Sequence, residues 1–70
     1  MTREERRNDI NERIGVAIAE RNFQPKGSQA YNDLTKIIKD IRCEYQNGVK
    51  TRIIMRYDEN TRRYYGVDIA

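Results

Sequence analysis

Residues 50–70 read KTRIIMRYDENTRRYYGVDIA, and along this stretch apolar residues alternate with polar ones. The apolar members share odd-numbered positions: Ile53, Met55, Tyr57, Tyr65, Val67 and Ile69. A period of two is typical of strands that turn one face to a core and the other to solvent. A polar turn around Asn60 separates two such runs, so the stretch predicts an antiparallel hairpin with strands over about 49–57 and 62–69.

The register of this hairpin follows from keeping the odd-numbered residues on one face. With the turn centred on Asn60, the expected opposing pairs are Asp58 with Arg62, Met55 with Tyr65, Ile53 with Val67, and Arg52 with Asp68. Two of these pairs join opposite charges, which agrees with the register. The pairing matters because a slip of one residue turns every side chain of a strand to the other face.

A further strand is expected over about 42–46, because Cys43 and Tyr45 continue the odd-numbered apolar positions. A three-residue loop at 46–48, with Gly48 in a left-handed bulge, keeps both side chains on the apolar face. A two-residue turn ending at the same glycine would move them to the charged face, so the longer loop is preferred. The carboxyl-terminal half therefore predicts a three-stranded antiparallel meander.

Two segments before the meander carry the helical period. The first, over about 3–21, repeats isoleucine at every fourth residue. The second, over about 29–41, has apolar residues at i, i+3, i+4 and i+7. These apolar positions are Ile10, Ile14 and Ile18 in the first segment, and Leu34, Ile37, Ile38 and Ile41 in the second. Pro25 and Gly27 interrupt the pattern between them, which predicts two antiparallel helices joined by a short loop.

Local signals mark where these helices begin. Thr2 with Glu5 fits a capping box, and Ser28 is a good amino-terminal cap for the second helix. Within the first helix, Gly15 has two interpretations. It is either tolerated at a cost of about 1 kcal/mol, or it forms, with Ala19 one turn later, a place where another backbone approaches closely.

The fold class predicted is α+β: a two-helix hairpin packed on a three-stranded antiparallel meander, forming one small domain over residues 1–70. Of these 70 residues only 37% are hydrophobic and 36% are charged. A chain this short hides about 60% of the surface that its unfolded form exposes. We therefore expect a thin core, and a partner or second copy that buries what one copy leaves uncovered.

Composition argues against several kinds of chemistry. The chain has no histidine and one cysteine, Cys43, so it offers neither a zinc ligand set nor a Cys-His nucleophile. Its four glycines are scattered, which excludes a glycine-rich phosphate loop. We expect no enzymatic activity, no metal and no cofactor. The lone cysteine, the absence of a secretory leader and the lack of a long apolar run lead us to expect a cytoplasmic protein with no membrane partner.

The even-numbered face of the meander is the candidate binding surface. Its members are Lys50, Arg52, Ile54, Arg56, Arg62 and Tyr64. Arginine forks suit phosphate oxygens, a tyrosine ring can stack on a base, and an apolar residue in the middle suggests a contact. Against this, Asp58 and Asp68 can neutralise two of the arginines, and a charged outer face is ordinary for a small sheet. The basic residues Arg3, Arg6 and Arg7 form a second patch, but Glu4 and Glu5 lie among them, which favours a solvated helix.

The function expected from these features is a small non-enzymatic interaction protein, such as an inhibitor, adaptor or regulator. It would bind a protein target through its sheet face, its unprotected carboxyl-terminal edge strand or its first helix. In size and charge-rich composition the chain is similar to the accessory proteins that bacteriophages encode to redirect host machinery, a likeness of composition alone. Self-association into a homo-oligomer is also expected from the open edge. The alternative is a nucleic-acid- or nucleotide-binding module that uses the basic face of the meander, since the net charge is +3.

Overall fold

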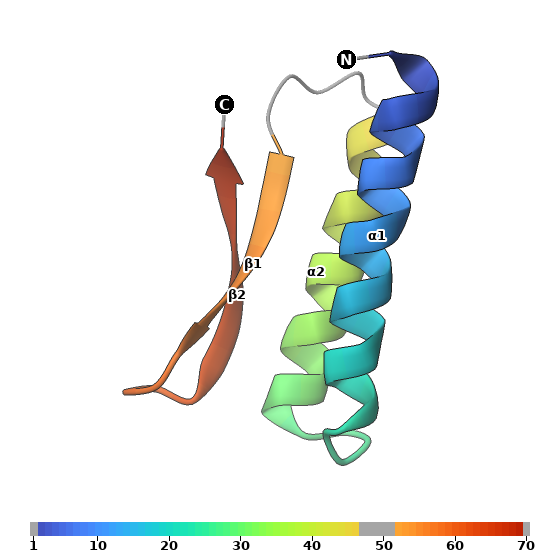
Figure 1. The fold of residues 1–70 in the computed structure, drawn as a ribbon. Coiled ribbons are helices and arrows are strands. Elements are labelled where there is room, and N and C mark those ends of the chain that lie inside the picture. Colours follow the sequence, from blue (N-terminus) through green and yellow to red (C-terminus); the bar gives the residue numbers. More distant parts are fainter. Residues whose placement is uncertain (1, 47–51, 70) are drawn as a thin grey trace.

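The computed structural model describes residues 2–46 and 52–69, which form two helices followed by two strands. Helix α1 spans Arg3–Asn22 and helix α2 spans Gln29–Gln46. Strand β1, Arg52–Asp58, pairs with strand β2, Arg63–Ile69, as an antiparallel hairpin. The helices lie side by side and antiparallel, and the hairpin covers one side of the pair (Figure 1). The α+β class and the helical hairpin are thus confirmed.

The ends of the helices form as the local sequence predicts. The Thr2 hydroxyl accepts a hydrogen bond from the backbone N–H of Glu5 at 3.1 Å, which caps α1. The Ser28 hydroxyl accepts one from the backbone N–H of Tyr31 at 3.2 Å and caps α2. Gly27 in the connecting loop has a φ of 82°, a conformation that glycine adopts without steric cost.

The strand expected over 42–46 is wrong, because these residues form the last turns of α2. The helical period continues past Ile41 to Glu44, which is only 2% exposed and faces α1. The buried face of α2, made of leucine and isoleucine as far as Ile41, thus continues with Glu44, which is paired with Arg13 of α1. A prediction based on the spacing of apolar residues does not include a buried glutamate, so it ended the helix too early. Gln46, expected in a loop over 46–48, is the last residue of α2, and the rest of that loop falls on residues 47–51, outside the described residues.

The register of the hairpin also differs from the prediction, by one residue. Asp58 opposes Arg63 where Arg62 was expected, and Met55 opposes Gly66 where Tyr65 was expected. The loop is therefore one residue longer than predicted, and Arg62 takes a left-handed φ of 57° within it. The extra loop residue turns β2 over relative to β1, so its even-numbered residues face the helices.

The core lies between the two helices and the inner face of the hairpin. Its buried members are Ile10, Ala17, Leu34, Ile37, Ile38 and Ile41, and the hairpin adds Ile53, Met55 and Tyr64. Gly66 also faces inward, since a Cβ there would lie 2.8 Å from the Cγ2 atom of Ile53. Gly15 has open space around it, so the close approach considered there does not occur within the described chain. Cys43, expected in a strand, lies half-buried on α2.

Candidate functional site

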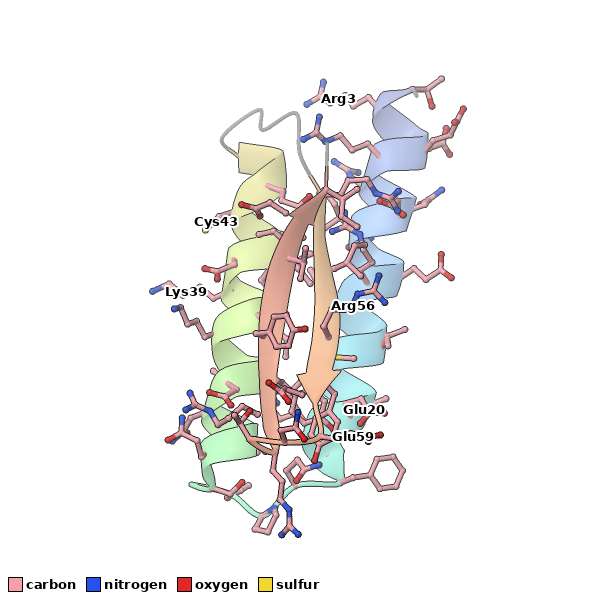
Figure 2. All side chains as sticks on the ribbon, turned by 90° about the vertical axis from the view of Figure 1, so that its left-hand side faces the viewer. Arg3, Glu20, Lys39, Cys43, Arg56 and Glu59 are labelled. Atoms are coloured by element: carbon pink, nitrogen blue, oxygen red, sulfur yellow. The ribbon has the colours of Figure 1, made fainter. Side chains whose placement is uncertain are left out.

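The side of the hairpin that faces away from the helices is the candidate site, and we call it the outer face. Because Ile53, Met55 and Tyr64 pack inward, the alternate residues on each strand point outward. By this alternation the outer face carries Ile54, Arg56, Tyr65, Val67 and Ile69 in its middle, and the charged residues Arg52, Asp58 and Arg63 at the two ends of the hairpin. Figure 2 looks directly onto it: both helices lie behind the hairpin, and no described segment lies in front.

The middle of the outer face is mainly apolar, whereas the sequence predicts a basic face. Ile54 pairs with Val67 at its centre, and Tyr65 pairs with Arg56 towards the loop. Tyr65 is 47% exposed and Ile69 is 40% exposed, while Ile54 and Val67 are half-buried. The middle of this face therefore holds four apolar side chains and Arg56, while Arg52 and Arg63 at its ends are paired with Asp9 and Asp33 of the helices.

The structure separates the six residues of the predicted binding surface. Ile54 and the exposed Arg56 lie on the outer face, and Arg62 is exposed in the loop. Arg52, at the start of β1, reaches back to α1, where its Nε and one Nη donate to Asp9 at 3.1 and 2.7 Å. Tyr64 lies on the inner face, and Lys50 lies outside the described residues.

Tyr64 was predicted on the outer, binding face but lies on the inner face, and its contacts give the reason. Its hydroxyl donates to a Glu20 carboxylate oxygen on α1 at 3.0 Å, and its ring centroid lies 4.8 Å from that of Tyr57. Partial burial and the hydrogen bond to Glu20 raise the pKa of Tyr64. Of the two adjacent tyrosines, Tyr64 is therefore the partly buried one that packs on the core, and Tyr65 is the exposed one.

Beneath the hairpin, Arg13 joins both helices to β1. Its guanidinium donates to a Glu44 carboxylate oxygen at 2.6 Å, to the carbonyl oxygen of Ile53 at 2.9 Å, and to Asp9 at 3.0 Å. Burial alone would raise the pKa of Asp9, but the hydrogen bonds and charges of Arg52 and Arg13 outweigh it and lower that pKa. Asp9 and Arg13, one turn apart on α1, form an ion pair that is part of this larger network.

A second arginine, Arg63, anchors the opposite end of the hairpin to α2. Its Nε and Nη donate to the two carboxylate oxygens of Asp33 at 2.7 and 2.9 Å, the two-pronged geometry that arginine favours. The hydrogen bond from Arg63, with a further one from Gln29, lowers the pKa of Asp33 to about 2. Arg52 and Arg63 together hold the hairpin to both helices. Two of the hairpin's arginines are therefore paired with acids of the same chain.

Asp33 gives the fold a predictable dependence on pH. Its pKa is about 2 in the folded chain, against about 3.9 in an unfolded one. A carboxyl with a depressed pKa contributes stability that is fully present above a pH of about 4 and is lost as pH falls through about 2. We expect Asp33→Asn to unfold at lower urea concentration than wild type at neutral pH, with the gap closing as pH approaches about 2. Urea titrations followed by circular dichroism measure this; the exposed loop variant Glu59→Gln is the control, and an equal gap at every pH would contradict the assignment.

A groove borders the outer face along β1. It measures about 340 Å³ and is lined by residues of both helices and of β1: Asp9, Glu12, Arg13, Val16, Ile41, Arg52, Ile54 and Met55. Ile54 belongs to both the groove and the outer face, so the two surfaces are continuous. Val16 on α1, which also lines the groove, is 53% exposed.

Sequence reasoning missed Tyr65, Val67 and Ile69 as surface residues, because it assigned them to the core. The sequence does contain a signal for the alternative. Tyr64 next to Tyr65 offers an apolar ring to either face of β2, and Gly66 in mid-strand marks a close approach on one face. The alternation by itself does not show whether the odd-numbered or the even-numbered residues of β2 face the core.

The described residues contain no group of three or more histidine, cysteine, aspartate or glutamate side chains placed to hold a metal ion. Among the same residues, no helix is both long and apolar enough to cross a bilayer. Comparison with protein-family models, curated proteins and solved structures finds no match to this chain.

Proposed function

We propose that this chain is a small non-enzymatic interaction protein that binds another polypeptide through the outer face of its hairpin. The observation that supports this most directly is the uncovered apolar outer face, with Tyr65 and Ile69 each at least 40% exposed. The helices cover the inner face of the hairpin, and no described segment covers its outer face. A partner that packs on the outer face would remove these exposed apolar side chains from water.

The composition of the outer face fits a protein partner. Tyrosine and arginine are enriched at protein interfaces and often carry much of the binding energy, and Tyr65 and Arg56 are cross-strand neighbours here. Ile54 and Val67 beside them supply the apolar centre. Contiguous apolar patches ringed by polar groups commonly mark sites of association.

The nucleic-acid alternative has weaker support. It relied on a row of arginines on one face, but Arg52 is paired with Asp9 and Arg63 with Asp33. The other two arginines of the described hairpin, Arg56 and Arg62, would neutralise too few phosphates to hold a polyanion at physiological salt. We therefore favour the protein-binding function.

A selection experiment tests the proposal even while the identity of the partner is open. A displayed library of random peptides is selected on the wild-type chain, and the recovered peptides are measured against Val67→Glu and against Asn32→Glu, an exposed site on α2. Both variants add one negative charge, so they are matched. We expect most peptides to bind wild type and Asn32→Glu alike and to lose about tenfold or more in affinity for Val67→Glu, because a buried charge opposes docking. Peptides that are indifferent to Val67→Glu, while circular dichroism shows that variant to be folded, would refute the outer face as the docking site.

A further inference from the structure

The free edge of β2 is a second surface that no segment of the described chain covers. The sheet of the described residues has two strands, so each strand pairs along one edge and is free along the other. The free edge of β2 lies on the side of α2, and that of β1 lies on the side of α1 (Figure 2). A groove of about 410 Å³ lies between β2 and α2, lined by the apolar residues Ile37 and Ile53 and by the exposed residues Gly66 and Asp68.

The contacts of Ile53 show which backbone groups point to this edge. Opposing residues of an antiparallel pair alternate: one pair exchanges both of its backbone hydrogen bonds, and in the next pair the N–H and C=O groups point away from the partner strand. The carbonyl oxygen of Ile53 accepts a hydrogen bond from Arg13 of α1 at 2.9 Å, so it points away from β2. Its partner Asp68 therefore directs its own N–H and C=O to the free edge of β2, and so does Gly66, two residues earlier.

The contacts of Tyr64 indicate the same alternation at the other end of the hairpin. Tyr64 shares the parity of Asp68, so its N–H should also point to the free edge of β2. A hydrogen bond from the backbone of Tyr64 is among the causes that lower the pKa of Asp33 on α2, which lies on that side. The ring centroids of Tyr57 and Tyr64 lie 4.8 Å apart, which fits opposing residues that do not exchange hydrogen bonds, because the side chains of such pairs are closer.

The two free edges differ in what already occupies them. At the edge of β1, Arg13 occupies the carbonyl oxygen of Ile53, and paired ions line the groove beside it. At the edge of β2, no side chain of the described chain bonds to the backbone of Gly66 or Asp68. Gly66 also has no side chain that could shield the backbone. Open N–H and C=O groups on a strand edge pair readily with an additional strand, so the edge of β2 is the better place for one.

The groove beside β2 has an acidic end. Helix α2 and strand β2 run in the same direction from the contact of Asp33 with Arg63 (Figure 1). Asp40 is seven residues beyond Asp33, which is about 10 Å along a helix. Gly66 is three residues beyond Arg63, which is also about 10 Å along a strand. Asp40 therefore lies level with Gly66, and Asp68 follows it along the groove.

Asp40 and Asp68 make this end of the groove attractive to a cation. Both line the groove, and neither forms an ion pair with another described residue. Lys36 also lines the groove, but it lies one turn of α2 before Asp40, towards the loop of the hairpin. A cationic side chain beside Gly66 would thus meet two carboxylates.

We infer that the free edge of β2 binds an extended segment of another polypeptide, which adds to the sheet as a strand and places a lysine or arginine over the acidic end of the groove. The backbone groups of Gly66 and Asp68 hold the segment by hydrogen bonds, and the carboxylates of Asp40 and Asp68 select its basic side chain. Alternate side chains of the segment point into the groove, over Ile37 and Ile53. This inference goes beyond the proposed function, because it concerns the edge of the sheet and not its outer face.

Amide hydrogen exchange followed by NMR tests the edge in the chain itself. The amides of Gly66 and Asp68 should exchange about tenfold or more faster than those of Tyr65 and Val67, whose N–H groups bond to β1. Equal protection of the two sets of amides would show that the free edge is assigned wrongly. A bound segment should slow the exchange of Gly66 and Asp68, whereas Met55, at the free edge of β1, should keep its rate.

Selected peptides test the chemistry of the partner, and the probes are those recovered from the displayed library on the wild-type chain. Peptides that bind at the edge should contain lysine or arginine and should lose about tenfold or more in affinity for Asp40→Lys, because a like charge then faces their basic side chain. Glu59→Lys makes the same change of charge at an exposed site in the loop and should bind as wild type does. Circular dichroism checks that both variants are folded.

Methylation of the peptide backbone separates strand addition from other modes of binding. In an added strand only alternate N–H groups bond to β2. N-methyl groups at every second position of the peptide should therefore abolish binding, and those at the positions between should be tolerated. Losses without this period of two would overturn the added strand.

The outcomes separate this inference from the proposed function. Peptides that Val67→Glu weakens and Asp40→Lys does not would support the outer face, and a selection that yields only such peptides overturns the inference. Peptides that Asp40→Lys weakens and Val67→Glu does not would support the edge and count against the outer face. A wild-type chain that sediments as a dimer, with the amides of Gly66 and Asp68 protected in the absence of peptide, would show that a second copy occupies the edge and would overturn the inference.

Discussion

Replacing Arg13 with methionine should lower the free energy of unfolding by about 3–5 kcal/mol, the usual result of removing one partner from a buried ion pair. Glu44 is 2% exposed and accepts a hydrogen bond from Arg13 at 2.6 Å. Without the guanidinium, this carboxylate is left buried and unpaired, and the carbonyl oxygen of Ile53 loses its donor as well. Urea denaturation followed by circular dichroism measures the loss.

The double variant Arg13→Met, Glu44→Leu separates the cost of an unpaired charge from the cost of lost packing. Replacing both partners of a buried pair with apolar residues of similar size is often neutral, so the double variant should recover most of the stability. Arg42→Met, at an exposed position of α2, is the matched control and should change the free energy by about 0.5 kcal/mol or less. If Arg13→Met is as mild as this control, the network does not hold the helices and β1 together in the way its geometry indicates.

Leu34→Ala should cost about 2–5 kcal/mol, because Leu34 is fully buried and its truncation leaves a cavity as well as removing apolar contacts. Leu34 belongs to the cluster that packs against Ile53, Met55 and Tyr64 of the hairpin, so the cavity would open between α2 and the sheet. The same urea titrations measure this loss.

Leu34→Met is the control for that substitution, since it nearly conserves volume and should cost less than about 1.5 kcal/mol. Equal losses for alanine and methionine would show that shape, and not the cavity, determines stability at this site. A loss below about 1 kcal/mol for alanine would mean that the surrounding side chains collapse into the space.

The helices could be predicted from the sequence because their signals are local. Ile10 and Ile14 in α1, and Leu34 and Ile41 in α2, lie at helical spacing, and Thr2 and Ser28 cap helices within three residues of themselves. Such signals do not depend on what packs across the fold. The presence of a hairpin was equally clear, since two alternating runs flank a polar turn.

The candidate site could not be predicted because it depends on contacts between distant residues. The parity of β2 follows from a loop one residue longer than expected and from hydrogen bonds that Arg63 and Tyr64 make with helices far earlier in the chain. A strand with tyrosines at adjacent positions can bury either one at similar cost. The arginines of the hairpin likewise looked available in the sequence, and only their acidic partners on α1 and α2 show that two of them are engaged.

The class of fold, the extent of α1 and the start of α2 are therefore encoded locally, because helical periodicity and capping act over a few residues. Packing between distant segments sets the helical state of 42–46, the burial of Tyr64, and the exposed apolar face made by Tyr65, Val67 and Ile69. The physical reason is that Glu44 can be buried only when Arg13 of α1 pairs with it. Which side of β2 faces the core is likewise set by hydrogen bonds from Arg63 and Tyr64 to Asp33 of α2 and Glu20 of α1.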